Sequence, residues 1–238
     1  MSSERIPMPR EVRTAADEGR LVSQAGAPTV RMQPGLYTLG IAKRRDALLY
    51  VPAGYDAERP APLAVMLHGA GGDERHGMSL LRDHADDAGI VVLAPASRRE
   101  TWDVLLGAYG PDVEHVDAAL DAAFERCAID PSRIAVGGFS DGASYALSLG
   151  LTNGDLFTHV IAFSPGFMAP AGQHGAPRCY VSHGTHDRVL PIDRCSRRIA
   201  PALERAGYDV RYREFDGPHV VPADIAHDAC EWLAARWE

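Results

Sequence analysis

Short, uniformly apolar runs separated by helical segments constrain this fold more than any other feature of the sequence. Each run has three to five residues, too few for a helix, and none alternates as a strand with one face in water would. Strands that helices cover on both faces have this composition. The runs are 63–67, 90–94, 134–136, 160–163 and 179–181.

Further strands and three helices are predicted around these runs. Segments 46–51 and 208–215 predict strands, and the first is expected to pair antiparallel with 36–42 near the edge of the sheet. Three other segments have the helical spacing of apolar residues. Pro201, which lacks a backbone donor, is expected to kink or split the second of them. The helical segments are 111–127, 193–206 and 225–233.

Alternating strands and helices predict a three-layer α/β fold with a mostly parallel central sheet and helices on both faces. The 238 residues suit one such domain. The first 35 residues are polar and contain four prolines, so we interpret 1–35 as a partly irregular N-terminal arm and 36–238 as a single domain. The short segment between Phe163 and Cys179 leaves room for little or no lid. Ligands bind such sheets at the carboxyl ends of the strands.

Charge and composition exclude several classes of protein. The formal net charge is −8, whereas nonspecific nucleic-acid binding needs a basic surface. The N-terminus resembles neither a secretory signal nor a membrane anchor, and no apolar stretch approaches the roughly 20 residues that span a bilayer. We therefore expect a cytoplasmic protein with no nucleic-acid partner and no stable membrane association. Its four cysteines form no CxxC pair and are expected to be free, mostly buried thiols.

The stretch GGFSDGAS, residues 137–144, contains the pattern G-x-S-x-G between an apolar run and a helix rich in small residues. In a sharp turn from strand to helix, a serine hydroxyl projects above the sheet. No space then remains for side chains at Gly138 and Gly142. Ser140 is therefore the candidate nucleophile. The alternative is a structural serine in a turn.

A serine hydroxyl needs a base at neutral pH, and that base needs a carboxylate to orient it. His219 lies in the loop FDGPHVVP after the last predicted strand, and Asp187 lies in YVSHGTHDRVLP after the preceding one. The order Ser, Asp, His is that of α/β-hydrolases. Two rival carboxylates are Asp193, which suits a helix N-cap, and Asp216, which suits a turn.

Attack on an acyl carbon creates an oxyanion that preorganised N–H groups must stabilise. One such group is the backbone N–H of Asp141, next to the nucleophile. The second is expected from Ala70 in the loop LHGAGGD, whose glycines permit close approach of the backbone. The alternative is a glycine-rich turn without a catalytic part. No histidines show a zinc-binding spacing and the loop lacks the features of a phosphate loop, so neither a metal nor a cofactor is expected.

The motifs LHGAGGD, GGFSDGAS, HGTHDRVLP and GPHVVP resemble those of the α/β-hydrolase superfamily, and most closely those of the phospholipase/carboxylesterase family. The resemblance extends from about residue 36 to the C-terminus. It implies that Ser140 is the nucleophile, that His219 is the general base and acid, and that Asp187 orients it. It also implies an oxyanion hole made by the amides of Ala70 and Asp141.

Other features extend or depart from this resemblance. The HG-x-GG loop and Trp102 are also similar to polyhydroxybutyrate depolymerase-like and feruloyl esterase-like proteins. His186 is a departure, because related chains more often carry a small residue before the aspartate, and we interpret it as an exposed loop residue. The small lid predicts an open, shallow pocket, with Trp102, Val189 and Leu190 as candidates for its lining.

These features together predict a carboxylesterase-type serine hydrolase, without a cofactor, that acts on small-molecule esters of short to medium acyl chain through an acyl-enzyme. Thioester hydrolysis uses the same triad and differs in the leaving group. Peptidase or amidase activity is a second alternative, and a non-catalytic binding protein of hydrolase fold is a third. A monomer or a homodimer is expected.

Overall fold

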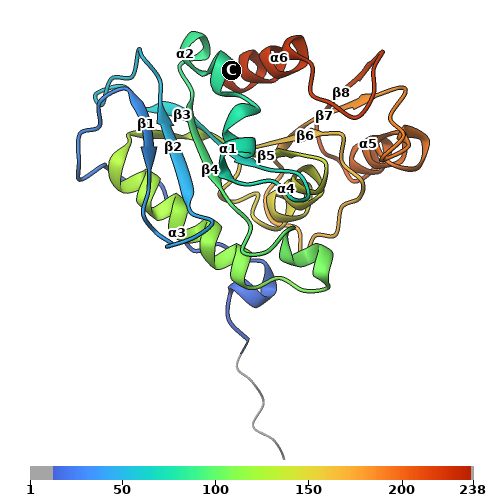
Figure 1. Ribbon diagram of the computed structural model, residues 1–238, viewed down its shortest axis with the longest axis horizontal. Coiled ribbons are helices and arrows are strands. Elements are labelled where there is room, and N and C mark those ends of the chain that lie inside the picture. The colour runs from blue at the N-terminus through green and yellow to red at the C-terminus, as the bar shows by residue number, and fades with distance from the viewer. Residues whose placement is uncertain (1–12, 237–238) are drawn as a thin grey trace, which may run out of the picture.

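The computed structural model describes residues 13–236, which contain an eight-stranded sheet with helices on both faces (Figure 1). The strand order is β1-β2-β4-β3-β5-β6-β7-β8, and all neighbours are parallel except β1 with β2 and β2 with β4. The predicted fold class and the antiparallel edge pair are confirmed. The strands are β1 (Gly35–Thr38), β2 (Ala47–Val51), β3 (Ala61–Leu67), β4 (Val91–Pro95), β5 (Ile129–Phe139), β6 (His159–Phe163), β7 (Arg178–Gly184) and β8 (Val210–Phe215).

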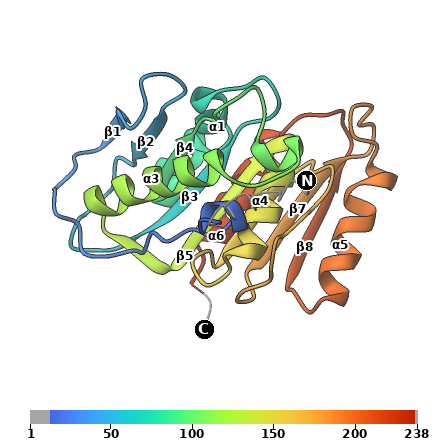
Figure 2. The same ribbon diagram turned by 90° about the horizontal axis from the view of Figure 1, so that it is seen from below.

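Two groups of helices enclose the sheet. One face packs against α3, α4 and α5, which lie toward the viewer in Figure 2, and the other packs against α1, α2 and α6. The predicted helix at 111–127 is confirmed as α3, and the one at 225–233 is confirmed as the central part of α6. The helices are α1 (Glu74–Ser79), α2 (Arg82–Ala88), α3 (Pro111–Arg126), α4 (Asp141–Thr152), α5 (Ser196–Arg205) and α6 (Ala223–Ala234).

Strand β3 shows why the central runs are uniformly apolar. Leu63, Val65 and Leu67 pack in the core on the α3 and α4 side, whereas Ala64 and Met66 pack on the opposite side. None of the five has any exposed surface. Burial of each large aliphatic side chain stabilises the fold by about 1.5–3 kcal/mol, so both faces of the strand must be apolar.

Two elements differ from their predicted form. Strand β5 begins at Ile129, earlier than predicted. The prediction missed residues 129–133 because Asp130, Ser132 and Arg133 are polar, and the pairing with β3 shifts register between Ala61 and Leu63. A search for uniformly apolar runs does not detect this polar part of the strand. Helix α5 continues through Pro201 rather than splitting there. The break occurs instead at Cys195, between a short 3-10 helix (Ile192–Arg194) and α5.

The described part of the N-terminal arm, residues 13–34, lies along the domain. The buried side chain of Asn153, at the end of α4, accepts from the amide of Leu21 at 2.9 Å and donates to the carbonyl of Gly19 at 2.8 Å. The carboxylate of Asp117 in α3 accepts from the amides of Val22 and Ser23. The arm is therefore attached through backbone amides, and the side chains of Arg20 and Ser23 add bonds to Asp155 and Asp117. Residues 1–12 of the predicted arm lie outside the described range.

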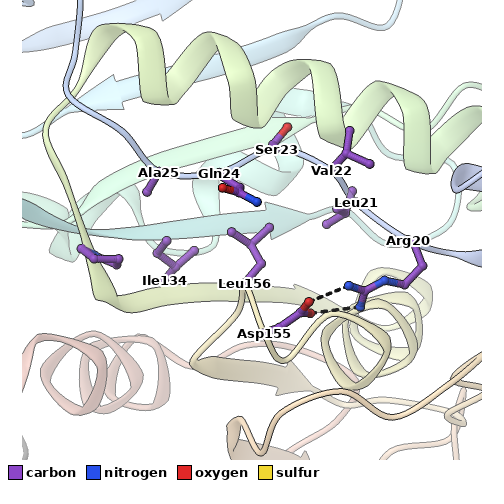
Figure 3. Close-up of a pocket in the computed structure, with 10 residues that line it drawn as sticks. Arg20, Leu21, Val22, Ser23, Gln24, Ala25, Ile134, Asp155 and Leu156 are labelled. Carbon is purple, nitrogen blue, oxygen red and sulfur yellow. Dashed lines mark hydrogen bonds and ion pairs between the residues drawn. The ribbon is translucent and has the colours of Figure 1, made fainter.

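A cavity of about 470 Å³ lies between the arm and the start of β5 (Figure 3). Arg20 and Asp155 form an ion pair of 2.6 Å at one end of it, and Ile134 and Leu156 line it from the domain side. Because Ser140 follows the opposite end of β5, this cavity lies away from the candidate nucleophile.

Replacement of Asn153 by alanine is expected to loosen the arm. The substitution removes buried hydrogen bonds to Leu21, Gly19 and Leu149 and should lower the free energy of unfolding by about 1–3 kcal/mol. Limited proteolysis should then cut residues 13–30 faster. Arg31→Ala, which breaks an exposed ion pair with Glu58, is the control and should cost less than about 1 kcal/mol. Equal effects of the two variants would contradict the role of Asn153.

Candidate active site

Ser140 occupies a strained turn between β5 and α4. Its φ of 57° and ψ of −118° lie in a region that residues with a side chain rarely adopt. A Cβ on Gly138 would lie 2.6 Å from the backbone of Gly142, and a Cβ on Gly142 would lie 2.3 Å from the carbonyl oxygen of Leu67. The backbone therefore requires glycine at both positions, as the strand-to-helix turn predicts.

The turn holds Ser140 against the neighbouring strand. Its N–H donates to the carbonyl of Phe163, at the end of β6, at 2.9 Å. The residue is 9% exposed, and its hydroxyl forms no hydrogen bond within residues 13–236. Helix α4 starts at the next residue, so the free amides of its first turn lie beside the serine.

Asp187 and His219 form a short contact. His219 Nδ1 lies 2.5 Å from Asp187 Oδ2, and Asp187 Oδ1 accepts from the amides of Val189 and Leu190, each at 2.8 Å. Burial alone would raise the pKa of Asp187. The amide of Leu190, the imidazole of His219 and the amide of Val189 outweigh that effect and hold the pKa below its ordinary value. The carboxylate is therefore ionised.

The rival carboxylates do not bond to His219. Asp193 contacts Arg197 at 2.8 Å. Asp216, whose side chain is 88% exposed, pairs with His186 at 2.9 Å. His186 itself is 73% exposed, which agrees with its interpretation as a surface loop residue.

The Asp187 contact determines which nitrogen of His219 carries the proton. An ionised carboxylate only accepts, so Nδ1 donates and Nε2 holds the lone pair. Nε2 is buried and has no hydrogen-bond partner within the described residues, so no hydrogen bond joins it to Ser140 here. The ring packs on Phe139, the residue before Ser140, with centroids 4.5 Å apart. The lone pair on His219 Nε2 is thus free to accept a proton beside the turn that bears Ser140.

The loop after β3 lies against Ser140. A Cβ on Gly69 would lie 3.4 Å from the Cβ of Ser140. The amides of Gly71 and Gly72 are used within the structure, at Glu100 and Gly69. Those of Ala70 and Asp141, the two predicted oxyanion donors, make no hydrogen bond within residues 13–236.

Buried polar side chains support this loop. The ring of His68 accepts from the amide of Ser97 at Nε2, 2.9 Å away, and donates from Nδ1 to the carbonyl of Gly69, 2.7 Å away. Arg45 donates to the carbonyl of Gly72 at 2.8 Å. Sequence reasoning missed both roles. His68 directly precedes the glycines of the loop, which is a usable signal, whereas nothing in the sequence around Arg45 marks it.

Trp102 does not occupy its predicted place. Its side chain has no exposed surface, and its indole N–H donates to the carbonyl of His68 at 2.9 Å. The ring stacks on Tyr145 of α4 with centroids 5.0 Å apart. Trp102 therefore fixes the loop from beneath. A fully buried ring does not line an open pocket, so this prediction was wrong.

The other predicted lining residues lie on the loop after β7. Val189 is 66% exposed, and Leu190 is partly buried against Gly166. A cavity of about 400 Å³ that the sequence did not predict lies beside Phe139 and His219. Its further lining residues are Ser79, Leu80, Asp83, His84, Val220, Val221, Ala223 and Ala226.

The cysteines of the described range are buried thiols. All four cysteines are free and buried, as predicted. Burial raises the pKa of Cys127, Cys179 and Cys230 to about 12, so these thiols stay protonated. Among the residues of the described range, no group of three or more His, Cys, Asp or Glu is arranged to hold a metal ion, and no helix has the length and hydrophobicity to span a membrane.

Comparison with known proteins agrees with this geometry. A family model described as Phospholipase/Carboxylesterase matches residues 111–235, more than half of the chain. The chain belongs to the phospholipase/carboxylesterase family. The predicted family is thus confirmed, and the matched residues include the nucleophile turn, Asp187 and His219.

Curated proteins similar to this chain include feruloyl esterases. It is 29% identical over 183 residues to feruloyl esterase C of Emericella nidulans, covering 72% of this chain and 66% of the relative. It is 30% identical over 158 residues to the probable feruloyl esterase C of Aspergillus terreus, covering 63% and 57%. The chain thus spans about three fifths of the length of these relatives.

Solved structures share the fold. Esterase PE8 superposes with a TM-score of 0.62 at 23% identity, covering 86% of this chain and 98% of that one. The carboxylesterase of Bacillus cereus gives 0.60 at 20% identity, covering 80% and 94%. At these identities the likeness confirms the α/β-hydrolase fold and nothing finer.

Replacement of Gly142 by alanine is expected to disrupt the nucleophile turn. The new Cβ would meet backbone atoms of Leu67 and His68. Overpacking of this kind costs at least about 1–3 kcal/mol, and ester hydrolysis should fall with it. Gly54→Ala, where no atom lies within 4 Å of the new Cβ, is the matched control and should change stability by less than about 1 kcal/mol. Denaturant unfolding measures both. A stable, active Gly142→Ala variant would contradict the steric argument.

Proposed function

We propose that this protein hydrolyses carboxylic esters with Ser140 as nucleophile, His219 as general base and acid, and Asp187 as the residue that orients His219. The observation that carries the proposal is the 2.5 Å contact between His219 Nδ1 and Asp187 Oδ2. It leaves the Nε2 lone pair free beside the strained turn that presents Ser140. The family and its esterase relatives support the same reaction class.

The reaction proceeds through an acyl-enzyme. His219 Nε2 removes the proton of the Ser140 hydroxyl as Oγ attacks the acyl carbon. The resulting imidazolium then gives that proton to the leaving alcohol. Nε2 then deprotonates a water that attacks the acyl-enzyme, and it returns that proton to Ser140 Oγ as the bond between the acyl carbon and Oγ breaks and the acid leaves.

Two backbone amides stabilise the oxyanion. We assign them to Ala70 and Asp141, because their N–H groups have no other partner in the described structure. The neighbouring amides of Gly71 and Gly72 are already bonded. Preorganised donors of this kind are each worth about 10²–10³-fold in kcat, and the buried supports at His68 and Trp102 keep the loop in place between turnovers.

The substrate is a small ester. The cavity of about 400 Å³ beside His219 is of the size that binds a small organic group. Its apolar lining by Leu80, Val220 and Val221 suits an acyl chain of short to medium length or an aromatic group. Because curated relatives are named feruloyl esterases, hydroxycinnamate esters belong among the test substrates. Residues 164–177 connect β6 directly to β7, which supports a site without a large lid.

Replacement of Ser140 by alanine is expected to abolish turnover. Loss of a triad nucleophile lowers kcat by several orders of magnitude. The assay compares nitrophenyl esters of increasing acyl length with methyl ferulate, an acyl-CoA thioester and an anilide. Preferred cleavage of the thioester or the anilide would move the assignment to a thioesterase or an amidase. An alanine variant that works at the parental rate would remove Ser140 from the mechanism.

Replacement of Asp187 by asparagine is expected to lower kcat by about 10³–10⁴-fold. The amide donates to Nδ1 and so favours the tautomer whose Nε2 carries the proton and cannot act as a base. KM should change little, because Asp187 is buried and does not reach the substrate. Asp216→Asn, on the exposed rival carboxylate, is the matched control and should retain parental kcat. A parental kcat in Asp187→Asn would refute the assignment.

A further inference from the structure

A second histidine contacts the carboxylate that holds His219. His183, near the end of β7, has no exposed surface. Its Nε2 lies 3.1 Å from Asp187 Oδ2 and 2.8 Å from the carbonyl oxygen of Leu190. The proposed reaction uses His219 and Asp187 but assigns no role to this ring.

The surroundings of His183 determine its protonation. Burial lowers the pKa of His183, so the ring is neutral near neutral pH and carries one N–H. Nε2 faces two oxygens that only accept, and it must therefore hold that proton. Nδ1 accepts from the hydroxyl of Ser196, the buried first residue of α5, at 2.6 Å.

We propose that His183 is a positioning residue whose Nε2–H, bonded to the carbonyl of Leu190 and 3.1 Å from Asp187 Oδ2, helps to fix the orientation and the basicity of the carboxylate that controls His219. The inference rests on the proposed triad. Asp187 Oδ1 accepts from the amides of Val189 and Leu190, and Oδ2 contacts the imidazole nitrogens of His219 at 2.5 Å and of His183 at 3.1 Å.

This arrangement has a directional electrostatic consequence. The His183 N–H disperses part of the negative charge on Oδ2, which weakens the attraction of Asp187 for a protonated His219. Without His183, Asp187 would attract the His219 imidazolium more strongly, and the base would lose its proton at higher pH. The carboxylate would also be free to rotate about its Cβ–Cγ bond on the Oδ2 side.

Few other charges face this site in the described structure. Glu214 of β8 pairs in register with His183, but its carboxylate is bound by Arg197 at 2.6 Å and by Tyr212 at 2.9 Å. Burial and then Asp187 raise the pKa of the Cys195 thiol, and the nearby Arg194 and Arg198 lower it by less, so the thiol is neutral. His183 and His219 are thus the imidazoles that Asp187 binds.

The test compares His183→Leu, which removes the donor, with His183→Gln, whose side-chain amide donates from a similar position. His183→Leu should lower kcat about 10–100-fold, the effect typical of residues that orient a functional ligand, and leave KM within about 3-fold. The acid limb of the kcat/KM profile should move to higher pH. His183→Gln should restore most of kcat and return the limb toward its parental position. Ser196→Ala removes the hydrogen bond to His183 Nδ1. It should lower kcat and move the acid limb to higher pH, each by less than His183→Leu does.

His159→Leu is the matched control, because His159 is also buried, on the adjacent strand β6, and lies among Thr158, Trp232 and Arg178 rather than at Asp187. It should leave the acid limb in place. A parental kcat and an unmoved limb in His183→Leu overturn the inference. So does a loss of kcat that His183→Gln does not restore and that leaves the limb unmoved. If His183→Leu does not fold, Ser196→Ala decides by the same measurements.

A readout that does not need activity separates this inference from the proposed function. The proton between His219 Nδ1 and Asp187 gives a low-field NMR resonance, which should shift in His183→Leu and return in His183→Gln. If the parent cleaves no ester, the function fails while this shift still supports the positioning role. An identical resonance in parent and His183→Leu overturns the positioning role whatever the activity.

Discussion

Backbone crowding at the turn from β5 to α4 sets the position of every chemical group at this site. Carbonyl oxygens of β3 approach the turn so closely that neither Gly138 nor Gly142 has room for a Cβ. The turn forces Ser140 into its strained backbone conformation, and the surrounding parallel strands enforce it. The strands that confine the turn also end at the edge where the loops of Asp187 and His219 begin. The close packing of the sheet therefore excludes side chains at the two glycines and places the polar residues of the candidate site at one edge.

Polar groups buried around that turn are almost all satisfied, which explains how loops without regular structure stay in place. The loop after β3 is held by the ring of His68, the indole of Trp102 and the guanidinium of Arg45. The loop after β7 is held by the carboxylate of Asp187, which accepts from its own amides two and three residues further on. An unpaired buried polar group costs about 1–3 kcal/mol, so each of these bonds disfavours other loop conformations. Among the described residues, the hydroxyls of Ser164 and Tyr145 and the Nε2 of His219 are buried without a hydrogen-bond partner, and Nε2 is the atom that the proposed chemistry needs free.

The sequence predicts local features well where one chemical rule decides them. Uniform apolar runs identified the central strands, because burial on both faces requires apolar residues. The two glycines identified the turn at Ser140, because steric exclusion there permits no other residue type. Trp102 shows the limit of this reasoning. An aromatic residue near the site suits a pocket wall and a buried support equally, and only the fold places its ring beneath His68. His183 and Arg45 were likewise hidden, because their partners lie on loops whose relative positions no local pattern records.

The packing of His219 on Phe139 carries a consequence for motion at this site. Phe139 is the last residue of β5 and is covalently next to the nucleophile, whereas His219 lies on the loop after β8. Thermal displacement of the end of β5 therefore carries the imidazole along with the serine. The contact between the two rings thus favours joint displacement of the proposed proton donor and acceptor over independent motion of β5 and the loop after β8.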